Sequence, residues 1–305
     1  MGLSRGETVG EAELAARPGS DKIASIRAEQ RHRGGSMAPT YVTIERGLGP
    51  EGRVALVRFD RGDRINALSP EAMRQLRAAA LSFEDDLATS VVILTGNAHA
   101  FSAGFDLKDE ERKAKAAMGL AEQRKSIRVG PAMCRAWAEM EQVTICAIEG
   151  FAIGGGAALA VSLDFRILST AAHIRIPELA LGMNMSWGTI RRLLRLVGPA
   201  RTKQAIICAD DRIEPREAID WRLVEELAAP GEAVAAAMRL AERMARMPPL
   251  PVKMTKTTVN RLAGALDDLA CHMDLDQFVL TTRSEDHQEG VSAFLERRKP
   301  RFKGR

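Results

Sequence analysis

The chain has 305 residues, 46% of them hydrophobic, which is enough apolar material for one large globular domain or two modest ones. Its 44 basic and 40 acidic residues are interleaved and only 4% of residues are aromatic, so the net charge of +4 does not indicate nucleic-acid binding. The longest uncharged stretches, 87–105 and 150–163, are interrupted by polar residues or loaded with glycine, so we expect no membrane-spanning helix.

The first segment, residues 1–40, mixes Gly, Ser, Ala and charged residues with almost no periodic apolar pattern. Such a composition buries too little apolar surface to fold alone, so we predict a disordered N-terminal arm. The arm contains no apolar core of the kind found in secretory signals.

The pattern changes at Tyr41, where regular elements are predicted to begin. Residues 41–45 and 54–59 are strand-like and are separated by a segment rich in Gly and Pro, which predicts a hairpin. Ser69 followed by Pro70 is a helix N-terminus signal, and the helix is expected to run to about Glu84. The apolar run 91–95 predicts a strand that leads into a turn of small residues at 101–107.

The middle of the chain repeats this alternation. Residues 108–140 favour helix, 144–148 predict a buried strand, and a glycine-rich turn at 149–156 is followed by a helix-favouring stretch. Short strands are expected at 164–168 and 173–176, and from Ser186 onward nearly everything favours helix. Strands that alternate with helices, followed by a helical last third, predict an α/β fold.

The two turns are candidates for binding a developing negative charge. Both follow strand-like runs, and the small residues Ala103 and Gly155 could bring bare backbone N–H groups close to a ligand. Two preorganised donors stabilise the oxygen of an enolate by about 3 kcal/mol each, so facing turns would form an oxyanion hole. A Gly-Gly-Gly run is also common in tight turns and close helix packing, and that reading stays open.

Proton abstraction beside a carbonyl also needs a positioned base, and Glu178 is the candidate. It lies between apolar residues just after a predicted strand, where desolvation would raise its pKa. Glu178 could instead cap a backbone segment or pair with Arg191 or Arg192. The sequence has neither a Walker motif nor Gly-x-Gly-x-x-Gly, and Ser186 lacks the glycine of a nucleophile elbow.

The cysteines and histidines show no metal-ligand spacing, so no metal site is predicted. The four cysteines form no Cys-x-x-Cys pair and are typical of reduced, buried thiols in a cytoplasmic protein: Cys134, Cys146, Cys208 and Cys271.

Four segments in order resemble the crotonase superfamily, the enoyl-CoA hydratase/isomerase family, over about residues 41–303. They are the Asn-Ala-Leu segment at 61–68, the turn at 101–107, the turn at 150–159 and the tail at 284–300. The resemblance implies a crotonase-like α/β spiral of ββα repeats, with the acyl-CoA site in a core at 41–230. It also implies a C-terminal helical region at 231–305 that forms homotrimers, often stacked as homohexamers.

Coenzyme A thioesters are the substrates that this resemblance implies, so coenzyme A is part of the substrate and no separate cofactor is expected. Ala103 and Gly155 fall on the two oxyanion donors of the family, and Glu178 falls on the second of its two catalytic glutamates. The turn formed by Ala103, Gly104, Phe105 and Asp106 falls on the segment that also holds coenzyme A. Trp187 is expected to narrow the acyl pocket.

One position departs from the pattern, because Ala158 stands where hydratases of the family have their first catalytic glutamate. A single glutamate suits an enoyl-CoA isomerase, whereas family frequency favours a hydratase. A hydroxycinnamoyl-CoA hydratase-lyase, and a non-catalytic CoA-binding or RNA-binding relative, are the remaining alternatives.

Overall fold

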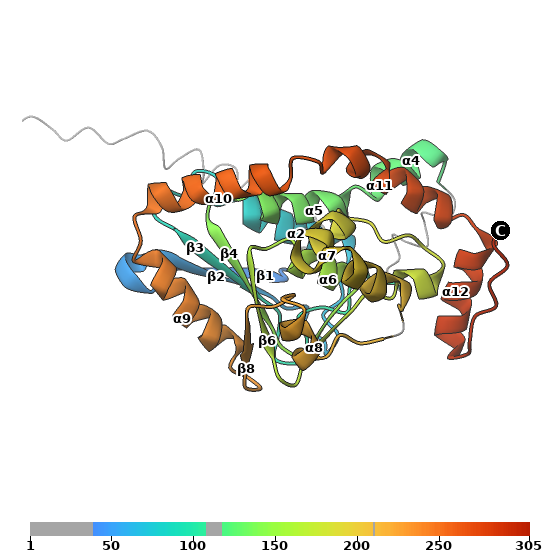
Figure 1. Ribbon diagram of the computed structural model, residues 1–305, viewed down its shortest axis with the longest axis horizontal. Coiled ribbons are helices and arrows are strands. Elements are labelled where there is room, and N and C mark those ends of the chain that lie inside the picture. The colour runs from blue at the N-terminus through green and yellow to red at the C-terminus, as the bar shows by residue number, and fades with distance from the viewer. Residues whose placement is uncertain (1–38, 108–117, 210) are drawn as a thin grey trace, which may run out of the picture. The chain divides into compact units, whose positions relative to one another are not determined.

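The computed structural model describes residues 39–107, 118–209 and 211–305, except the side chains of Asp268, Ala270 and Cys271. The part from Thr40 to Arg305 forms one unit (Figure 1). The arm predicted at 1–40 lies outside the described residues, apart from its last two.

The central feature is a six-stranded sheet in the order β1-β2-β3-β4-β6-β8. Its first pair is the predicted antiparallel hairpin, and every later neighbour is parallel. A second, two-stranded parallel sheet joins β5 to β7. The strands are β1 (Val42–Leu48), β2 (Val54–Phe59), β3 (Val91–Thr95), β4 (Val143–Ile148), β5 (Phe151–Ile153), β6 (Phe165–Ser169), β7 (His173–Arg175) and β8 (Glu226–Ala228).

Helices connect and cover these strands. Two single-turn helices, η2 (Pro50–Gly52) and η3 (Glu178–Leu181), lie in connections. The longer helices are α2 (Pro70–Leu81), α4 (Leu120–Ser126), α5 (Val129–Glu139), α6 (Gly155–Ala160), α7 (Thr189–Ile207), α8 (Pro215–Asp220), α9 (Ala233–Ala245), α10 (Pro249–Ala263), α11 (Asp268–Thr281) and α12 (Glu285–Glu296).

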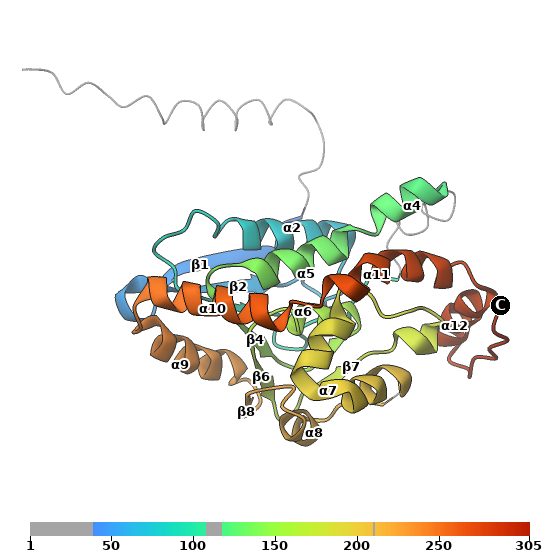
Figure 2. The same ribbon diagram turned by 45° about the horizontal axis from the view of Figure 1, so that its top comes forward.

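Both faces of the large sheet are buried at its central strands β3 and β4, which explains why these strands are almost entirely apolar rather than alternating. Ile93 and Ile145 face the alanines of α9, whose small side chains allow close packing. On the other face, Met73 of α2 and Trp137 of α5 pack with Leu94. Figure 2 shows α2 and α9 on opposite sides of the sheet. The result is a layered α/β core that holds the strand ends in place.

Most elements match their predictions. The Ser69 hydroxyl caps α2 by accepting a 3.2 Å hydrogen bond from the Ala72 amide, and α7 is interrupted at Gly198, just before Pro199. Two short strands were missed: β5, within the second glycine-rich turn, and β8, in the last third. Three residues are too few to show a period, so only tertiary pairing defines these strands.

Predictions from the sequence also concerned membrane-spanning helices, metal sites and the burial of the cysteines. Among the described helices, none combines the length and apolarity needed to cross a membrane. Residues 39–107, 118–209 and 211–305 contain no group of three His, Cys, Asp or Glu side chains placed to hold a metal ion. Cys134 and Cys146 are buried free thiols, but Cys208 is exposed, which corrects the expectation that it is buried.

Candidate active site

The two small-residue turns lie against each other. The carbonyl of Ser102 accepts a 2.9 Å hydrogen bond from the Ile153 amide, and Ser102 forms a parallel bridge with Ala152. A Cβ atom on Gly104 would lie 2.5 Å from the Ile153 carbonyl oxygen and 2.9 Å from the Gly155 nitrogen. Only glycine allows this approach, so the sequence places the turns together as predicted.

The first turn is anchored by the Asn-Ala-Leu segment, a role that the sequence analysis missed. The buried Asn66 side chain donates to the carbonyls of Phe59 and Phe101, at 2.9 and 3.0 Å. Asp106 was expected to contact the substrate, but its carboxylate accepts a 2.7 Å hydrogen bond from Arg61, and Asp106 does not line the cavity. Asp106 therefore stabilises the first turn through Arg61, outside the cavity lining.

The backbone of the first turn also corrects the predicted oxyanion donor. The Ala103 N–H donates to the Ile65 carbonyl at 2.8 Å, so this amide is already used within the fold. Gly104 then adopts φ +82°, and the next amide nitrogen, that of Phe105, lies 3.4 Å from the position of a Cβ atom on Gly155. Ala103 still lines the cavity, but Phe105 is the residue whose amide nitrogen lies next to Gly155 of the second turn.

The second turn presents Gly154 and Gly155 to the cavity. Gly154 adopts φ +53°, and its N–H donates to the Arg175 carbonyl at 2.9 Å. Gly155 is the first residue of α6, where backbone N–H groups have no acceptor within the helix. The predicted donor Gly155 is therefore placed at the cavity wall, next to Phe105.

Glu178 begins η3, directly after β7 and Pro177, and its carboxylate lies against the second turn. A Cβ atom on Gly154 would lie 2.8 Å from Glu178 Oε1, so the glycine makes room for the acid. Glu178 Oε2 is hidden from solvent and has no hydrogen-bond donor among the described residues. Neither Arg191 nor Arg192 forms a described ion pair with it, since Arg191 pairs with Asp267. The carboxylate is thus held close to the turn, and the positive charge that acts on it most is that of Arg175.

Burial of this carboxylate raises the pKa of Glu178 from 4.5 to about 7, although a backbone hydrogen bond and the charge of Arg175 oppose the rise. If Glu178 removes a proton, kcat/KM should fall about tenfold per pH unit below a pH of about 7. The folded protein also holds this proton more tightly than the unfolded chain does, so the group's contribution to stability decreases as the pH rises from 4.5 to about 7. A pH–rate profile without a limb near 7 would contradict the assignment.

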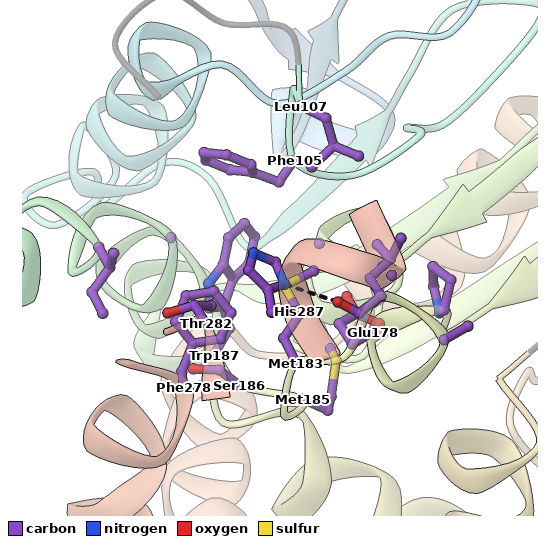
Figure 3. Close-up of a pocket in the computed structure, with 18 of the residues that line it drawn as sticks. Phe105, Leu107, Glu178, Met183, Met185, Ser186, Trp187, Phe278, Thr282 and His287 are labelled. Atoms are coloured by element: carbon purple, nitrogen blue, oxygen red, sulfur yellow. Dashed lines mark hydrogen bonds between the residues drawn. The ribbon is translucent and has the colours of Figure 1, made fainter. Parts of the chain in front are cut away.

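These groups line one cavity of about 1020 Å³. Figure 3 shows Phe105 and Leu107 on one side and Glu178, Met185 and Trp187 on the other. Among the described residues, Glu178 is the only carboxylate in the lining. The far walls come from α4, α11, α12 and the residues beside them. These three helices gather at one end of the fold in Figures 1 and 2. The lining residues there that the sequence did not indicate include Ile127, Gly130, Phe278, Thr282 and His287.

Ala158, at the position of the missing first glutamate, has an exposed fraction of 0% and lies in the hydrophobic core. It is not part of the cavity lining. Trp187, by contrast, lines the cavity as predicted, together with Gly155 and Phe105. The site therefore combines two adjacent turns, one carboxylate and a large aromatic wall.

Comparison with known proteins identifies the family of the chain. The family model for enoyl-CoA hydratase/isomerase matches residues 49–305. A crotonyl-CoA hydratase of Syntrophomonas wolfei is 32% identical over 84% of this chain and 96% of its own length. A short-chain-enoyl-CoA hydratase of Clostridium acetobutylicum is 33% identical over 83% of this chain and 95% of its own length.

Solved structures show the same fold. The crystal structure of a carnitinyl-CoA hydratase from Mycobacterium avium superposes with a TM-score of 0.75 at 28% identity, and covers 88% of this chain and all of its own. The crotonase fold predicted from the four sequence segments is confirmed. With the family model matching most of the sequence, the chain belongs to the enoyl-CoA hydratase/isomerase family of the crotonase superfamily.

Proposed function

We propose that the protein binds an enoyl-CoA thioester with its carbonyl oxygen at the Gly155 amide, and that Glu178 moves the proton. The observation that carries this proposal is the lone Glu178 carboxylate, with a pKa of about 7, held against the Gly154–Gly155 turn. A base with a pKa near the working pH transfers protons in both directions with little driving force lost. The Phe105 amide, facing Gly155 from the first turn, is the second candidate donor in place of Ala103.

One carboxylate favours a shift of the double bond over addition of water. In an isomerisation, Glu178 takes the proton from C2 of a 3-enoyl thioester, the two turns hold the enolate oxygen, and the same carboxyl returns the proton at C4. All atoms balance within the substrate and Glu178, so no second acid is needed. Hydration requires that a water molecule also be positioned and deprotonated, and Glu178 is the only carboxylate among the described lining residues.

Hydration is the second candidate, because the relatives from Syntrophomonas and Clostridium are named hydratases. The cavity also contains His287 of α12, whose Nδ1 lies 2.8 Å from the Leu181 carbonyl oxygen. An imidazole held in this way is a polar group able to orient a water molecule. A hydratase-lyase acting on aromatic acyl-CoAs would use the same turns and the same glutamate.

A substrate panel tests these alternatives. The protein is incubated separately with a 3-enoyl-CoA, crotonyl-CoA and feruloyl-CoA, and each product is separated and quantified. We expect conversion of the 3-enoyl thioester to the 2-enoyl thioester to be the fastest reaction. Faster formation of 3-hydroxyacyl-CoA from crotonyl-CoA would assign hydration instead. No turnover of any thioester, together with binding of CoA thioesters or of RNA, would identify a non-catalytic relative.

The exposed apolar side chains of the last helices support a homo-oligomer. A monomer seldom leaves so many large apolar groups in water on neighbouring helices. They are Leu250, Met254, Val259 and Leu262 around α10, and Leu266, Leu269 and Leu280 around α11. We infer that these helices contact other copies of the chain in a trimer or hexamer, and a monomeric mass in light scattering would contradict this.

A further inference from the structure

The indole of Trp187 is wedged between two glycines that lie far apart in the sequence. A Cβ atom on Gly130 of α5 would lie 2.2 Å from Trp187 Cε2, and one on Gly155 would lie 2.7 Å from Trp187 Cζ3. No side chain larger than hydrogen fits at either position while the ring stays where it is. Gly130 sits at the second position of a helix whose buried face is otherwise made of larger residues such as Met133, Cys134 and Trp137.

The backbone that carries this ring is in an unusual conformation. Trp187 has φ +61° and Gly188 has φ +68°, so two consecutive residues lie in the left-handed region. A residue with a large side chain rarely adopts this conformation unless its surroundings enforce it. The conformation directs the ring into the cavity beside Gly155. Figure 3 shows Trp187 among the side chains that line this cavity.

Asp274, on α11, holds the residues on both sides of Trp187. Its Oδ2 accepts hydrogen bonds from the Gly188 amide at 3.0 Å and from the Ser186 hydroxyl at 3.2 Å. The carbonyl of Trp187 itself accepts a 2.7 Å hydrogen bond from Arg192. The residues on both sides of Trp187 are therefore tied to one carboxylate of the C-terminal helical region.

The Trp187 ring and the Glu178 carboxylate lie against two adjacent residues of the second turn. Glu178 Oε1 lies against Gly154, and the Trp187 ring lies against Gly155. A thioester with its oxygen at the Gly155 amide and C2 facing Glu178 must therefore pass its first acyl carbons between the carboxylate and the indole. A substituent on C2 that points away from Glu178 meets the indole.

We propose that Trp187 determines specificity by excluding acyl groups branched at C2, and that Asp274 is the positioning residue that holds it there. This inference rests on the proposed acyl-CoA function. The favoured substrates are thioesters that carry no branch at C2, since an indole pinned between two glycine backbones has no room to retreat. Through Asp274, helix α11 sets how much bulk the site accepts.

The test compares crotonyl-CoA with 2-methylcrotonyl-CoA, which differ by one methyl group at C2. Dissociation constants for both are measured by calorimetry, and kcat/KM is measured for any reaction observed. In Trp187→Ala, we expect the preference for the unbranched thioester to fall about tenfold, the effect typical of one methyl group in a shaped pocket. Trp187→Phe should fall between this variant and the wild type.

Asp274 variants separate positioning from general stability. Asp274→Ala should weaken the preference for the unbranched thioester, as Trp187→Ala does. It should also shift the emission of Trp187, which is the part of the fluorescence that is lost in Trp187→Ala. Asp274→Asn keeps an oxygen that can accept both hydrogen bonds and should restore the wild-type preference. Asp276→Ala is the matched control, because Asp276 lies on the same helix but pairs with the exposed Arg124.

The results distinguish this inference from the proposed function. A wild type that turns over no thioester would refute the enzyme proposal. The ratio of the two dissociation constants would still test whether Trp187 excludes acyl groups branched at C2. If the ratio in Trp187→Ala stays within twofold of wild type, Trp187 does not determine specificity. If Asp274→Ala leaves both the ratio and the Trp187 fluorescence unchanged, Asp274 does not position the ring.

Discussion

We expect the Glu178→Gln variant to lose roughly 10²–10⁴-fold in kcat, the contribution typical of a positioned general acid or base. Glutamine has the same shape but cannot carry a proton between substrate carbons. Acyl-CoA affinity should change little, because in the proposed binding mode backbone amides, not this side chain, hold the thioester oxygen. The measurements are kcat with the best thioester of the substrate panel and its dissociation constant from calorimetry.

The stability of the same variant should change in the opposite direction. Glu178 Oε2 is buried with no donor among the described residues, so the ionised form is unfavourable in the folded protein. Above a pH of about 7, Glu178→Gln should therefore melt at a higher temperature than the wild type. The exposed Glu84→Gln is the matched control and should alter neither property. Near-wild-type turnover in Glu178→Gln would mean that another group carries the proton.

The strands that position the site were predictable because they are buried on both faces. Residues 91–95 and 143–148 are uninterrupted apolar runs, each followed by a turn of small residues, and parallel pairing brings those turns to the same edge of the sheet. Glu178 was predictable for a related reason. A charged residue between apolar neighbours directly after a strand indicates an acid that the fold holds at the end of that strand.

The oxyanion donor was not predictable at the level of a single amide. Consecutive amides in a turn point in different directions, and the direction depends on dihedral angles that residue types only limit. Here the positive φ of Gly104 separates the Ala103 amide, which is bonded to Ile65, from the Phe105 amide beside Gly155. The amide predicted from the small-residue pattern, that of Ala103, and the proposed donor, that of Phe105, lie two residues apart in the same turn.

The cavity walls depend on contacts between distant segments, which a single sequence does not show. Gly130 looks like a tolerated glycine in a helical pattern until the indole of Trp187 is seen against it. Asp274 belongs to a charged helical stretch, and nothing nearby in the sequence indicates that its carboxylate holds residues 186–188. A narrowed pocket at Trp187 was predictable from side-chain size, whereas the residues that fix the ring were not.

Gly155→Ala should be nearly as damaging as the loss of Glu178, with a fall in kcat/KM of roughly 10²–10³-fold. The new methyl group would lie 2.7 Å from the Trp187 ring and 3.4 Å from the Phe105 amide nitrogen, in the gap where the thioester oxygen must approach. The ring cannot move away easily, because Gly130 holds its other side. Turnover is measured together with the melting temperature and circular dichroism, so that loss of chemistry is separated from loss of fold.

Gly119→Ala makes the same chemical change without the same consequence. Gly119 has φ −64°, and among the described residues beyond its chain neighbours the nearest atom to its added methyl group would be Glu122 Oε2 at 3.9 Å, so this variant should keep wild-type activity. Adding Trp187→Ala to Gly155→Ala removes the clash with the ring but leaves the methyl group beside Phe105. If the loss of activity comes from the blocked oxygen site, the double variant should recover stability but little turnover. Full recovery of kcat/KM would show that Gly155 serves only to accommodate Trp187.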